Sequence, residues 1–369
     1  MRILALEPYY GGSHKAFLDG WINKSNHTWM LLSLPAYKWK WRMRHSAVHF
    51  ADEIAKLSKA GQSWDLLFCS DMLNLAEFLG LVRQSIQNLP TIVYFHENQF
   101  TYPVRVENER DYQFAMTNLT TALAATEVWF NSAFHRDSFL EALEKLLKQM
   151  PDYQPLESIE KIRSKSVIHP PGIENIQPRE KREPGPIRIL WAARWEHDKN
   201  PDDFFEALHM LKNSGIDFRL YCIGQQFRDT PEVFKHARKR FIKHIDQWGF
   251  IESRQEYIKT LKQADVIVST ANHEFFGITI LETISAGCFP MLANRLSYPE
   301  LLGLGKTQDI EECFYNGSAK DLANKLNILA QKITTESLWP NNFSPEFLTE
   351  RFRWDKLAKL YDQILQETI

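Results

Sequence analysis

The sequence predicts an α/β protein built from two doubly wound domains, each with a parallel sheet covered by helices. Three observations lead to this fold class. Short apolar, β-rich runs alternate with helical patterns, which is the order of successive βαβ units. The alternation begins again after a proline-rich interruption near the middle of the chain. The 369 residues, 44% of them apolar, are sufficient to bury two cores.

The expected elements follow in chain order. In the first half, strands are predicted at residues 2–6, 65–70, 91–96, 127–131 and 165–169, with helices at 73–85 and 133–148 among those between them. In the second half, strands are predicted at 187–192, 218–223, 265–269 and 289–293. We therefore expect an N-terminal Rossmann-like domain (1–176), a linker (177–186), a C-terminal Rossmann-like domain (187–343) and a final segment (344–369) with a helix at about 344–366.

Composition and charge exclude several classes of protein. The net charge of −2 provides no global attraction to nucleic acid, so any such contact must come from a local patch. The four cysteines follow neither a metal-finger nor a Cys-x-x-Cys spacing and are expected to be reduced. The first residues are too short an apolar run for a signal peptide, and no stretch reaches the ~20 apolar residues of a membrane span. We expect a soluble, cytoplasmic protein.

The strongest chemical motif is residues 274–282, in which two glutamates flank an aromatic-aromatic-Gly turn and an apolar helical pattern. If the turn delivers its residues into the first turn of a helix, their free N–H groups can bind phosphate. The second glutamate then lies about two helical turns onward. The two carboxylates could hold a sugar and a ribose on either side of a diphosphate. An ordinary amphipathic helix with two glutamates is the alternative. The residues are Glu274, Phe275, Phe276, Gly277, Ile278 and Glu282.

Two cations lie upstream on one loop. Arg194 and Lys199 follow the strand predicted at 187–192, and Pro201 with two aspartates resembles a helix start. Both cations are therefore expected at the carboxyl end of a parallel strand, where open α/β sheets bind ligands. Each could offset a phosphate charge by about 4 kcal/mol at an effective dielectric near 20, before desolvation. A solvated loop cation is the alternative for either residue taken singly.

Together these motifs resemble the signature of glycosyltransferase family 4, an Arg and a Lys five positions apart followed by a Glu-x7-Glu helix. The resemblance implies the GT-B architecture, two facing Rossmann-like domains with an interdomain cleft, and a last helix that returns to the first domain. It also implies that Arg194 and Lys199 hold the donor diphosphate, Glu274 the transferred sugar and Glu282 the ribose. Two residues depart from the family pattern. Ala193 stands where relatives usually have Gly, and Pro290 comes one residue later than usual after the Ala286-Gly287 pair.

The first domain is expected to hold the acceptor. Its first strand ends in a Gly11-Gly12 turn, followed by Ser13 and His14, where a backbone can approach a ligand and a helix start can face a phosphate. A plain tight turn is the alternative. Enzymes of family 4 place a Gly-rich loop over the donor at this point. The third strand of this half leads into a polar loop, in which we expect His96 at the reacting centre; its neighbours are Glu97, Asn98 and Gln99.

A basic aromatic segment lies between the strands predicted at 2–6 and 65–70. Cations alternate with Trp and Met between residues 38 and 44, and no acidic residue occurs between Gly20 and Ala51. On an extended backbone the cations would share one face, to bind phosphates, while the tryptophans could stack on unpaired bases. A half-buried strand with a solvated basic face is the alternative. The cations are Lys38, Lys40, Arg42 and Arg44, and the tryptophans Trp39 and Trp41. A second basic run, 235–244, is expected to be the wet face of a helix.

With these segments, the likeness narrows to the tRNA-queuosine α-mannosyltransferases. The Tyr-Tyr-Gly-Gly-Ser-His, Lys-Trp-Lys-Trp-Arg-Met-Arg, His-Glu-Asn-Gln and His-Glu-Phe-Phe-Gly motifs carry it, and it covers essentially the whole chain. It implies transfer of mannose from GDP-mannose to queuosine at the wobble position of tRNA(Asp), with retention at the anomeric carbon. His96, Glu274, Arg194 and Lys199 are the expected catalytic residues.

Further expectations concern metals, cofactors and rival functions. Neither His96-Glu97 nor His273-Glu274 belongs to a spaced three-ligand set, so no metal is expected, and no cofactor beyond the GDP-mannose donor. The expected partners are GDP-mannose and the tRNA anticodon loop, without a membrane or an obligatory protein partner. Three alternatives remain: a family 4 transferase for lipid or polysaccharide, against which the strand-like period of the basic segment argues, a non-catalytic sugar-nucleotide or tRNA-binding module, and a pyridoxal-phosphate phosphorylase.

Overall fold

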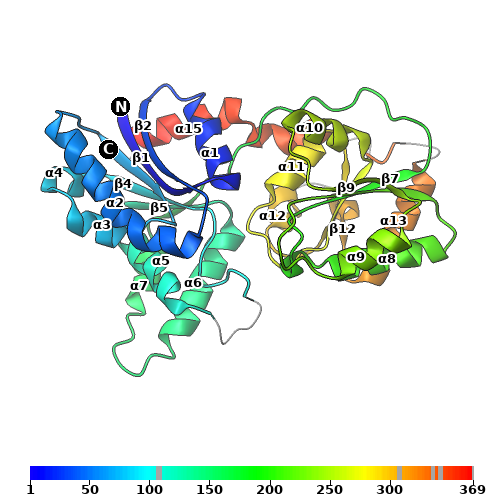
Figure 1. Cartoon of the computed structure of the whole chain (residues 1–369), viewed down its shortest axis with the longest axis horizontal. Coiled ribbons are helices and arrows are strands. Elements are labelled where there is room, and N and C mark those ends of the chain that lie inside the picture. Colours follow the sequence, from blue (N-terminus) through cyan, green and yellow to red (C-terminus); the bar gives the residue numbers. More distant parts are fainter. Residues whose placement is uncertain (105–109, 306–309, 334–336, 340–343, 368–369) are drawn as a thin grey trace. The chain divides into compact units, whose positions relative to one another are not determined.

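The computed structural model describes residues 1–104, 110–305, 310–333, 337–339 and 344–367 (Figure 1). The chain divides into two compact units: unit 1 comprises Met1–Gly172 with Trp354–Ile369, and unit 2 comprises Ile173–Arg353. Each unit has one six-stranded sheet in which every paired strand is parallel, with helices on both faces (Figure 1). The predicted α/β class with two doubly wound sheets is confirmed. The predicted boundary at residue 343, like residue 369, lies outside the described residues.

Unit 1 has the strand order β2-β1-β3-β4-β5-β6. Its strands are β1 (Arg2–Tyr10), β2 (Thr28–Pro35), β3 (Leu66–Ser70), β4 (Thr91–Phe95), β5 (Glu127–Phe130) and β6 (Ser166–Ile168). Its helices are α1 (Gly12–Ile22), α2 (Trp39–Lys59), α3 (Leu75–Leu81), α4 (Gln84–Gln87), α5 (Tyr112–Ala124), α6 (Ala133–Leu147), α7 (Glu157–Arg163) and α15 (Trp354–Glu367). The sequence does not predict β2, an edge strand with no fully buried side chain. The helix predicted at 73–85 is divided, because Val82 and Arg83 have extended backbone.

Unit 2 has the strand order β12-β11-β10-β7-β8-β9. Its strands are β7 (Ile187–Ala192), β8 (Phe218–Ile223), β9 (Ile245–Gly249), β10 (Val266–Ser269), β11 (Phe289–Ala293) and β12 (Phe314–Tyr315). Its helices are α8 (Pro201–Asn213), α9 (Val233–Arg240), α10 (Arg254–Gln263), α11 (Ile278–Ser285), α12 (Tyr298–Leu302), α13 (Ala319–Lys332) and α14 (Pro345–Thr349), with 3-10 turns η2 (His197–Lys199), η3 (Ile310–Cys313) and η4 (Glu350–Phe352). The edge strands β9 and β12 are not predicted from the sequence.

The single helix predicted at 344–366 is wrong. The chain there forms α14 and η4, passes through Arg353 in an extended conformation and begins α15 at Trp354. The Trp354 ring lies so close to Gly20 and Gly172 that a Cβ atom on either glycine would come within 2.1 or 2.4 Å of it. Asp362 accepts a hydrogen bond from the Trp21 indole at 3.0 Å. Thus α15 completes the core of unit 1.

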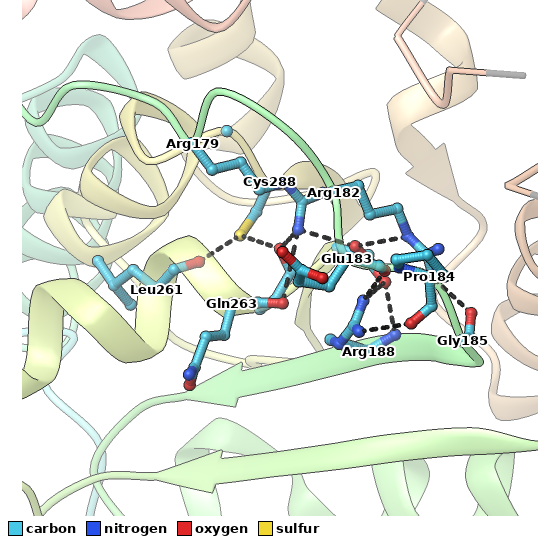
Figure 2. Close-up of polar contacts among 12 residues, drawn as sticks. Arg179, Arg182, Glu183, Pro184, Gly185, Arg188, Leu261, Gln263 and Cys288 are labelled. Carbon is cyan, nitrogen blue, oxygen red and sulfur yellow. Dashed lines mark hydrogen bonds and ion pairs between the residues drawn. The ribbon is translucent and has the colours of Figure 1, made fainter.

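The segment expected to be a linker is held on unit 2. The Asp265 carboxylate, fully buried before β10, lies 2.8 Å from Arg179, 3.1 Å from Arg182 and 3.6 Å from Arg188. Figure 2 shows these arginines also donating to backbone carbonyls, among them the carbonyl of Gly185. Arg179 and Arg182, two of the charged residues of this segment, therefore hold it against the sheet of unit 2. All four cysteines are buried and free, as predicted: Cys69, Cys222, Cys288 and Cys313.

Candidate functional site

In unit 2, the loops that follow β7 and β10 are joined by a buried lysine. Lys199, only 7% exposed, donates from Nζ to the His273 carbonyl at 2.6 Å. The same ammonium lies 3.1 Å from Asp198 and 3.5 Å from Glu274. The Thr270 hydroxyl donates to the Lys199 carbonyl at 2.9 Å. The sequence predicts Lys199 and Glu274 on two segments 75 positions apart, and the structure brings their charged groups into contact.

Electrostatics at this junction keep the neighbouring histidine neutral. Burial and the nearby Lys199 ammonium lower the pKa of His273 to about 4. The ring of His273 packs edge-on against Phe275, with centroids 4.4 Å apart. At neutral pH the positive charge of the junction therefore resides on Lys199.

The turn into α11 depends on glycine. Gly277 has φ +106° and occupies the N-cap position, and the helix begins at Ile278. A Cβ atom there would also lie 3.3 Å from Leu301. As the first residues of the helix, Ile278 and Thr279 have N–H groups without an intrahelical partner. The sequence therefore places a helix start at this turn correctly, and its binding of an anion stays a prediction.

The two aromatic residues of the motif do not belong to the helix, however. Phe275 and Phe276 are buried and precede its start, so the expectation that they lie in the first helical turn is wrong. The Phe276 N–H points to the Glu274 carboxylate at 3.5 Å, and the Ser297 hydroxyl donates to the Phe276 carbonyl at 3.0 Å. These contacts fix the shape of the turn, and the phenylalanine side chains serve as its apolar anchor.

Glu282 is held by two residues that the sequence reasoning missed. Arg254 donates to one oxygen of its carboxylate at 2.5 Å, and the Tyr257 hydroxyl donates to the other at 2.9 Å. Burial and the Glu282 carboxylate raise the pKa of Tyr257 well above its ordinary value, so the phenol stays protonated and can donate. No motif marks Arg254 or Tyr257, since they meet Glu282 only through the packing of α10 on α11.

A cavity of about 180 Å³ lies in unit 2 beside the first turn of α11, and neither Lys199 nor Glu274 belongs to its lining. It is lined by Arg194 after β7, by Thr279 in the first turn of α11 and by Tyr257 of α10, with the loops after β8 and β9 completing the wall. The Arg194 side chain is 39% exposed and lies 2.9 Å from Glu196. Arg194 and the α11 start thus face one space.

The departure at Ala193 has a structural explanation. Gly224, after β8, has φ +152°, and a Cβ atom on it would come within 1.7 Å of the Ala193 carbonyl oxygen. The close approach between these two loops therefore takes place at Gly224, and residue 193 can carry a methyl group.

In unit 1, a buried ion pair lies at the carboxyl end of the sheet. His14 Nδ1 is 3.2 Å from Glu7 Oε2, and the imidazole packs on that of His96 with ring centroids 4.0 Å apart and an interplanar angle of 31°. Burial by itself would lower the pKa of His14, but the Glu7 carboxylate outweighs it and raises the pKa to about 9. Burial and the neighbouring His14 hold the pKa of His96 well below its ordinary value. At neutral pH an imidazolium therefore lies against a neutral imidazole.

The Gly-Gly turn supports this arrangement. A Cβ atom on Gly11 would lie 2.4 Å from the Ala36 side chain, and Gly12 has φ +53°. Helix α1 starts at Gly12, so the exposed Ser13 belongs to its first turn, as the sequence predicts. His14 follows on the buried side of the same turn.

The loop after β4 corrects two expectations. Asn98 is fully buried, and its Oδ1 accepts from the Thr101 N–H at 3.0 Å. Gln99 is also buried, and its amide donates to Glu97 at 3.1 Å. In this structure Asn98 and Gln99 shape the loop instead of offering polar groups to an acceptor, whereas His96 and Glu97 remain partly exposed.

The basic aromatic segment is helical, so the predicted strand with two faces is wrong. Residues 39–44 open α2, whose buried positions Met43, Ala47, Phe50 and Ile54 recur at helical spacing. A seven-residue window shows the alternation but not this longer period.

The cations and tryptophans of this segment do not lie on two opposite faces. Trp39 packs on Phe114, with Lys40 5.8 Å and Arg44 5.0 Å from the centre of the same ring. Trp41 is 64% exposed. Lys38 and Arg42 flank this turn, and Arg42 donates to the Pro35 carbonyl at 3.1 Å.

One potential metal site exists among the described residues. Donor atoms of Glu7, His14 and His96 all lie within 4.8 Å of one another, a set that the sequence does not reveal. Here Glu7 is already hydrogen-bonded by His14, by the Ser70 hydroxyl at 3.0 Å and by the Tyr9 N–H at 2.8 Å. We interpret the group as a charged hydrogen-bond network. The absence of an essential metal stays a prediction.

Comparison with known proteins follows the same division of the chain. Residues 2–173 match the family model for the tRNA-queuosine alpha-mannosyltransferase N-terminal region, and residues 172–337 match that for glycosyl transferases group 1. The chain is 36% identical over 380 residues to the tRNA-queuosine alpha-mannosyltransferase of Drosophila melanogaster, covering 100% of this chain and 97% of the relative. The chain belongs to the tRNA-queuosine α-mannosyltransferase family.

Solved structures show the GT-B fold for this family member. The TM-score is 0.70 with Anabaena HepE in complex with UDP, at 15% identity over 100% of both chains. It is 0.69 with sucrose-phosphate synthase from Thermosynechococcus elongatus, at 14% identity over 100% of this chain and 99% of that one.

One argument against a lipid acceptor no longer holds. It relied on a strand-like period in the basic segment, but this segment opens the helix α2. A GDP-mannose-dependent alpha-(1-6)-phosphatidylinositol dimannoside mannosyltransferase of Mycobacterium tuberculosis is 32% identical, yet only over 31% of this chain and 29% of that relative. None of the helices in the described part of the chain combines the length and apolar character needed to cross a bilayer.

Proposed function

We propose that the protein transfers mannose from GDP-mannose to queuosine in the anticodon loop of tRNA(Asp), with retention at the anomeric carbon and without a metal ion. The observation that carries this proposal is the 36% identity to a tRNA-queuosine alpha-mannosyltransferase over the whole chain. The mycobacterial relative, described as GDP-mannose-dependent, supports the choice of donor. No cofactor beyond the donor is needed for this reaction.

We assign the donor to unit 2. Arg194, Lys199 and the N–H groups of Ile278 and Thr279 would bind the diphosphate, because cations and a helix start are the groups that stabilise such charge. Lys199 can do so while still donating to the His273 carbonyl, since an ammonium has three donors. The mannose would lie at Glu274.

The nucleoside would lie further along α11. Glu282 would accept from ribose hydroxyls, exchanging its contact with Arg254 or Tyr257. The cavity beside Arg194 and Tyr257 would receive the base.

The chemical step follows from a diphosphate leaving group. The acceptor hydroxyl oxygen forms a bond to the anomeric carbon while the bond from that carbon to the diphosphate oxygen breaks. The departing oxygen takes the hydroxyl proton, and attack from the departing face retains the configuration. Arg194 and Lys199 stabilise the charge of the departing GDP. In this proposal, neutral His96 accepts a hydrogen bond from a hydroxyl of the reacting sugar or the acceptor.

We assign the acceptor to unit 1. The cations of α2 suit phosphates, and the exposed Trp41 ring suits stacking on an unpaired base of a loop. Ser13 and Glu97 lie at the carboxyl ends of the strands, where the modified base would be received, and the buried His14 supports this edge through its ion pair with Glu7. The Trp39 ring packs against Phe114 and so supports this surface of α2.

Incubation with each common sugar nucleotide and total tRNA, followed by mass spectrometry of the digested nucleosides, tests the proposal. The expected result is a hexose-sized gain on queuosine, only with GDP-mannose and only in tRNA(Asp). Transfer to a lipid extract instead of tRNA would establish the lipid alternative. Donor binding without nucleotide release in the presence of tRNA would indicate a non-catalytic module.

A further inference from the structure

Helix α9 carries a concentration of cations that the proposed function does not use. Lys235, Arg238, Lys239 and Arg240 are all exposed on this helix, and exposed Lys243 lies three residues beyond its end. Within the described part of the chain, no ion pair joins any of these five side chains to a carboxylate. The adjacent Glu232 lies 3.8 Å from His236.

On other helices, several exposed lysines pair with a carboxylate one turn away. Lys56 pairs with Glu53 on α2, Lys148 with Glu144 on α6, and Lys259 with Glu256 on α10. The whole chain has a net charge of −2. The positive charge of α9 is therefore a local excess, of the kind that attracts a polyanion.

The apolar side of α9 is occupied by the protein's own core. Phe234, Ala237 and Phe241 are buried, and the Phe234 ring stacks on Trp195 with centroids 4.1 Å apart and an interplanar angle of 2°. This packing fixes the direction of the basic face. It also leaves no apolar stripe on the helix that could enter a membrane surface, which interfacial helices require. A polar, phosphate-rich partner fits better than a lipid.

The basic face lies away from the donor-binding helices of unit 2. Helices α8, α9 and α13 cover one face of the sheet, and α10 and α11 cover the other (Figure 1). Glu282 and the first turn of α11 are thus separated from α9 by the thickness of the sheet. A ligand on α9 is therefore not the sugar nucleotide, and a polymer that reacts at the candidate site can reach α9 only with another of its parts.

We infer that the basic face of α9 binds backbone phosphates of the substrate tRNA outside the anticodon loop. The inference rests on the proposed function, because it extends the contact with the same RNA. Apart from the His236 imidazole, which lies 3.8 Å from Glu232, α9 exposes no aromatic ring, in contrast to the start of α2 with Trp41. Its contacts are therefore to phosphates that position the RNA and not to bases. Because these phosphates lie outside the anticodon loop, an RNA that contains only this loop and its stem should not gain affinity from α9.

The test compares RNAs of two lengths. In the triple variant Lys235→Gln/Arg238→Gln/Lys239→Gln, affinity for full-length tRNA should fall on the order of tenfold at low salt. The slope of log affinity against log salt should decrease by about 2 to 3, because each phosphate contact contributes ~0.9. Affinity for an isolated anticodon stem–loop should not change. The matched control, Lys259→Gln/Lys262→Gln on α10, removes cations from the opposite face of the sheet and should leave both affinities unchanged.

Three outcomes overturn the inference: an unchanged salt slope with full-length tRNA, an equal loss with the stem–loop, or lost binding to phosphatidylserine vesicles with RNA binding intact. Hexose transfer to the stem–loop is measured alongside. If the wild-type protein transfers no hexose to any tRNA, the proposed function fails. If it does and the triple variant keeps its salt slope, only the role of α9 fails.

Discussion

The two candidate sites lie at the carboxyl ends of similar sheets, but they are built differently. In unit 2 the key cation, Lys199, is buried and hydrogen-bonded to the neighbouring loop. In unit 1 the cations of α2 are exposed, and Arg44 is held by the Phe114 ring and by a hydrogen bond to Gln113. A compact diphosphate suits a site formed before binding, whereas a large RNA suits a surface whose side chains can adjust. The carboxyl end of a parallel sheet can therefore carry either a buried, preformed group such as Lys199 or an exposed surface such as the start of α2.

The largest expected effect is in unit 2. Arg194→Ala should lower kcat at least about a hundredfold, because losing one electrostatic contact to a departing charge costs roughly 3 to 4 kcal/mol. Since the side chain is 39% exposed, the melting temperature should stay the same. Steady-state kinetics with GDP-mannose and tRNA measure the first effect, and thermal unfolding the second. Arg219→Ala, which removes an exposed arginine paired with Asp246, is the control. Equal kcat values for both variants would remove Arg194 from the site.

The ion pair of unit 1 predicts a pH dependence of stability. Because Glu7 raises the pKa of folded His14 to about 9, the contribution of His14 is complete below its unfolded pKa of about 6.5 and is lost as the pH rises to 9. Wild-type protein should therefore lose on the order of 3 kcal/mol of this contribution across that window. Glu7→Gln should remove most of this dependence. Urea unfolding at several pH values measures it, and parallel curves for both proteins would contradict the charged state of His14.

The anchor of the 177–186 segment should affect stability without affecting chemistry. Asp265→Asn leaves three arginines without their carboxylate and should lower the free energy of unfolding by roughly 2 to 4 kcal/mol. Urea unfolding measures this loss, and kcat should be unchanged. Glu144→Asn, which breaks an exposed pair on α6, should be indistinguishable from wild type. A large fall in kcat for Asp265→Asn would mean that the anchor also shapes the donor site.

The smallest effect is expected on α2. Trp41→Ala should weaken tRNA binding by about tenfold, because stacking on one base is worth ~1 to 3 kcal/mol. The ring is 64% exposed, so stability and the KM for GDP-mannose should not change. Fluorescence anisotropy with labelled tRNA measures the affinity. Tyr153→Ala removes another exposed ring of unit 1 and serves as the control. The same affinity in both variants would show that the RNA does not contact Trp41.

Sequence patterns predicted the parts of the molecule that depend on local order. The buried central strands appear as uninterrupted apolar runs, and Gly277 with the residues after it marks a helix start. The edge strand β9 was missed because its residues alternate and give no such run, whereas β2 was missed although Trp29 to Leu32 form a short one. The alternation at residues 38–44 is genuine, but it opens a helix whose period appears only over α2 as a whole.

The missed site residues depend on contacts between distant segments. Arg254 and Tyr257 meet Glu282 across two packed helices, and Glu7 meets His14 across the Gly-Gly turn. None of these pairs has a characteristic spacing in the chain. The burial of Asn98 likewise comes from its hydrogen bonds to Thr101 and Phe100, which a polar loop in the sequence does not indicate. Sequence motifs predicted that the sites lie at the carboxyl ends of the sheets. Which side chains form those sites is determined by packing between distant segments.

The insertion of Trp354 between Gly20 and Gly172 bears on how the chain matures during synthesis. The core of unit 1 includes Trp354, Leu357 and Tyr361, which leave the ribosome after all of unit 2. Unit 2 is contiguous and can fold while unit 1 still lacks its closing helix. A nascent chain therefore holds an unfinished apolar surface around Trp21 until α15 has been synthesised, and that interval is when the protein most needs chaperone protection.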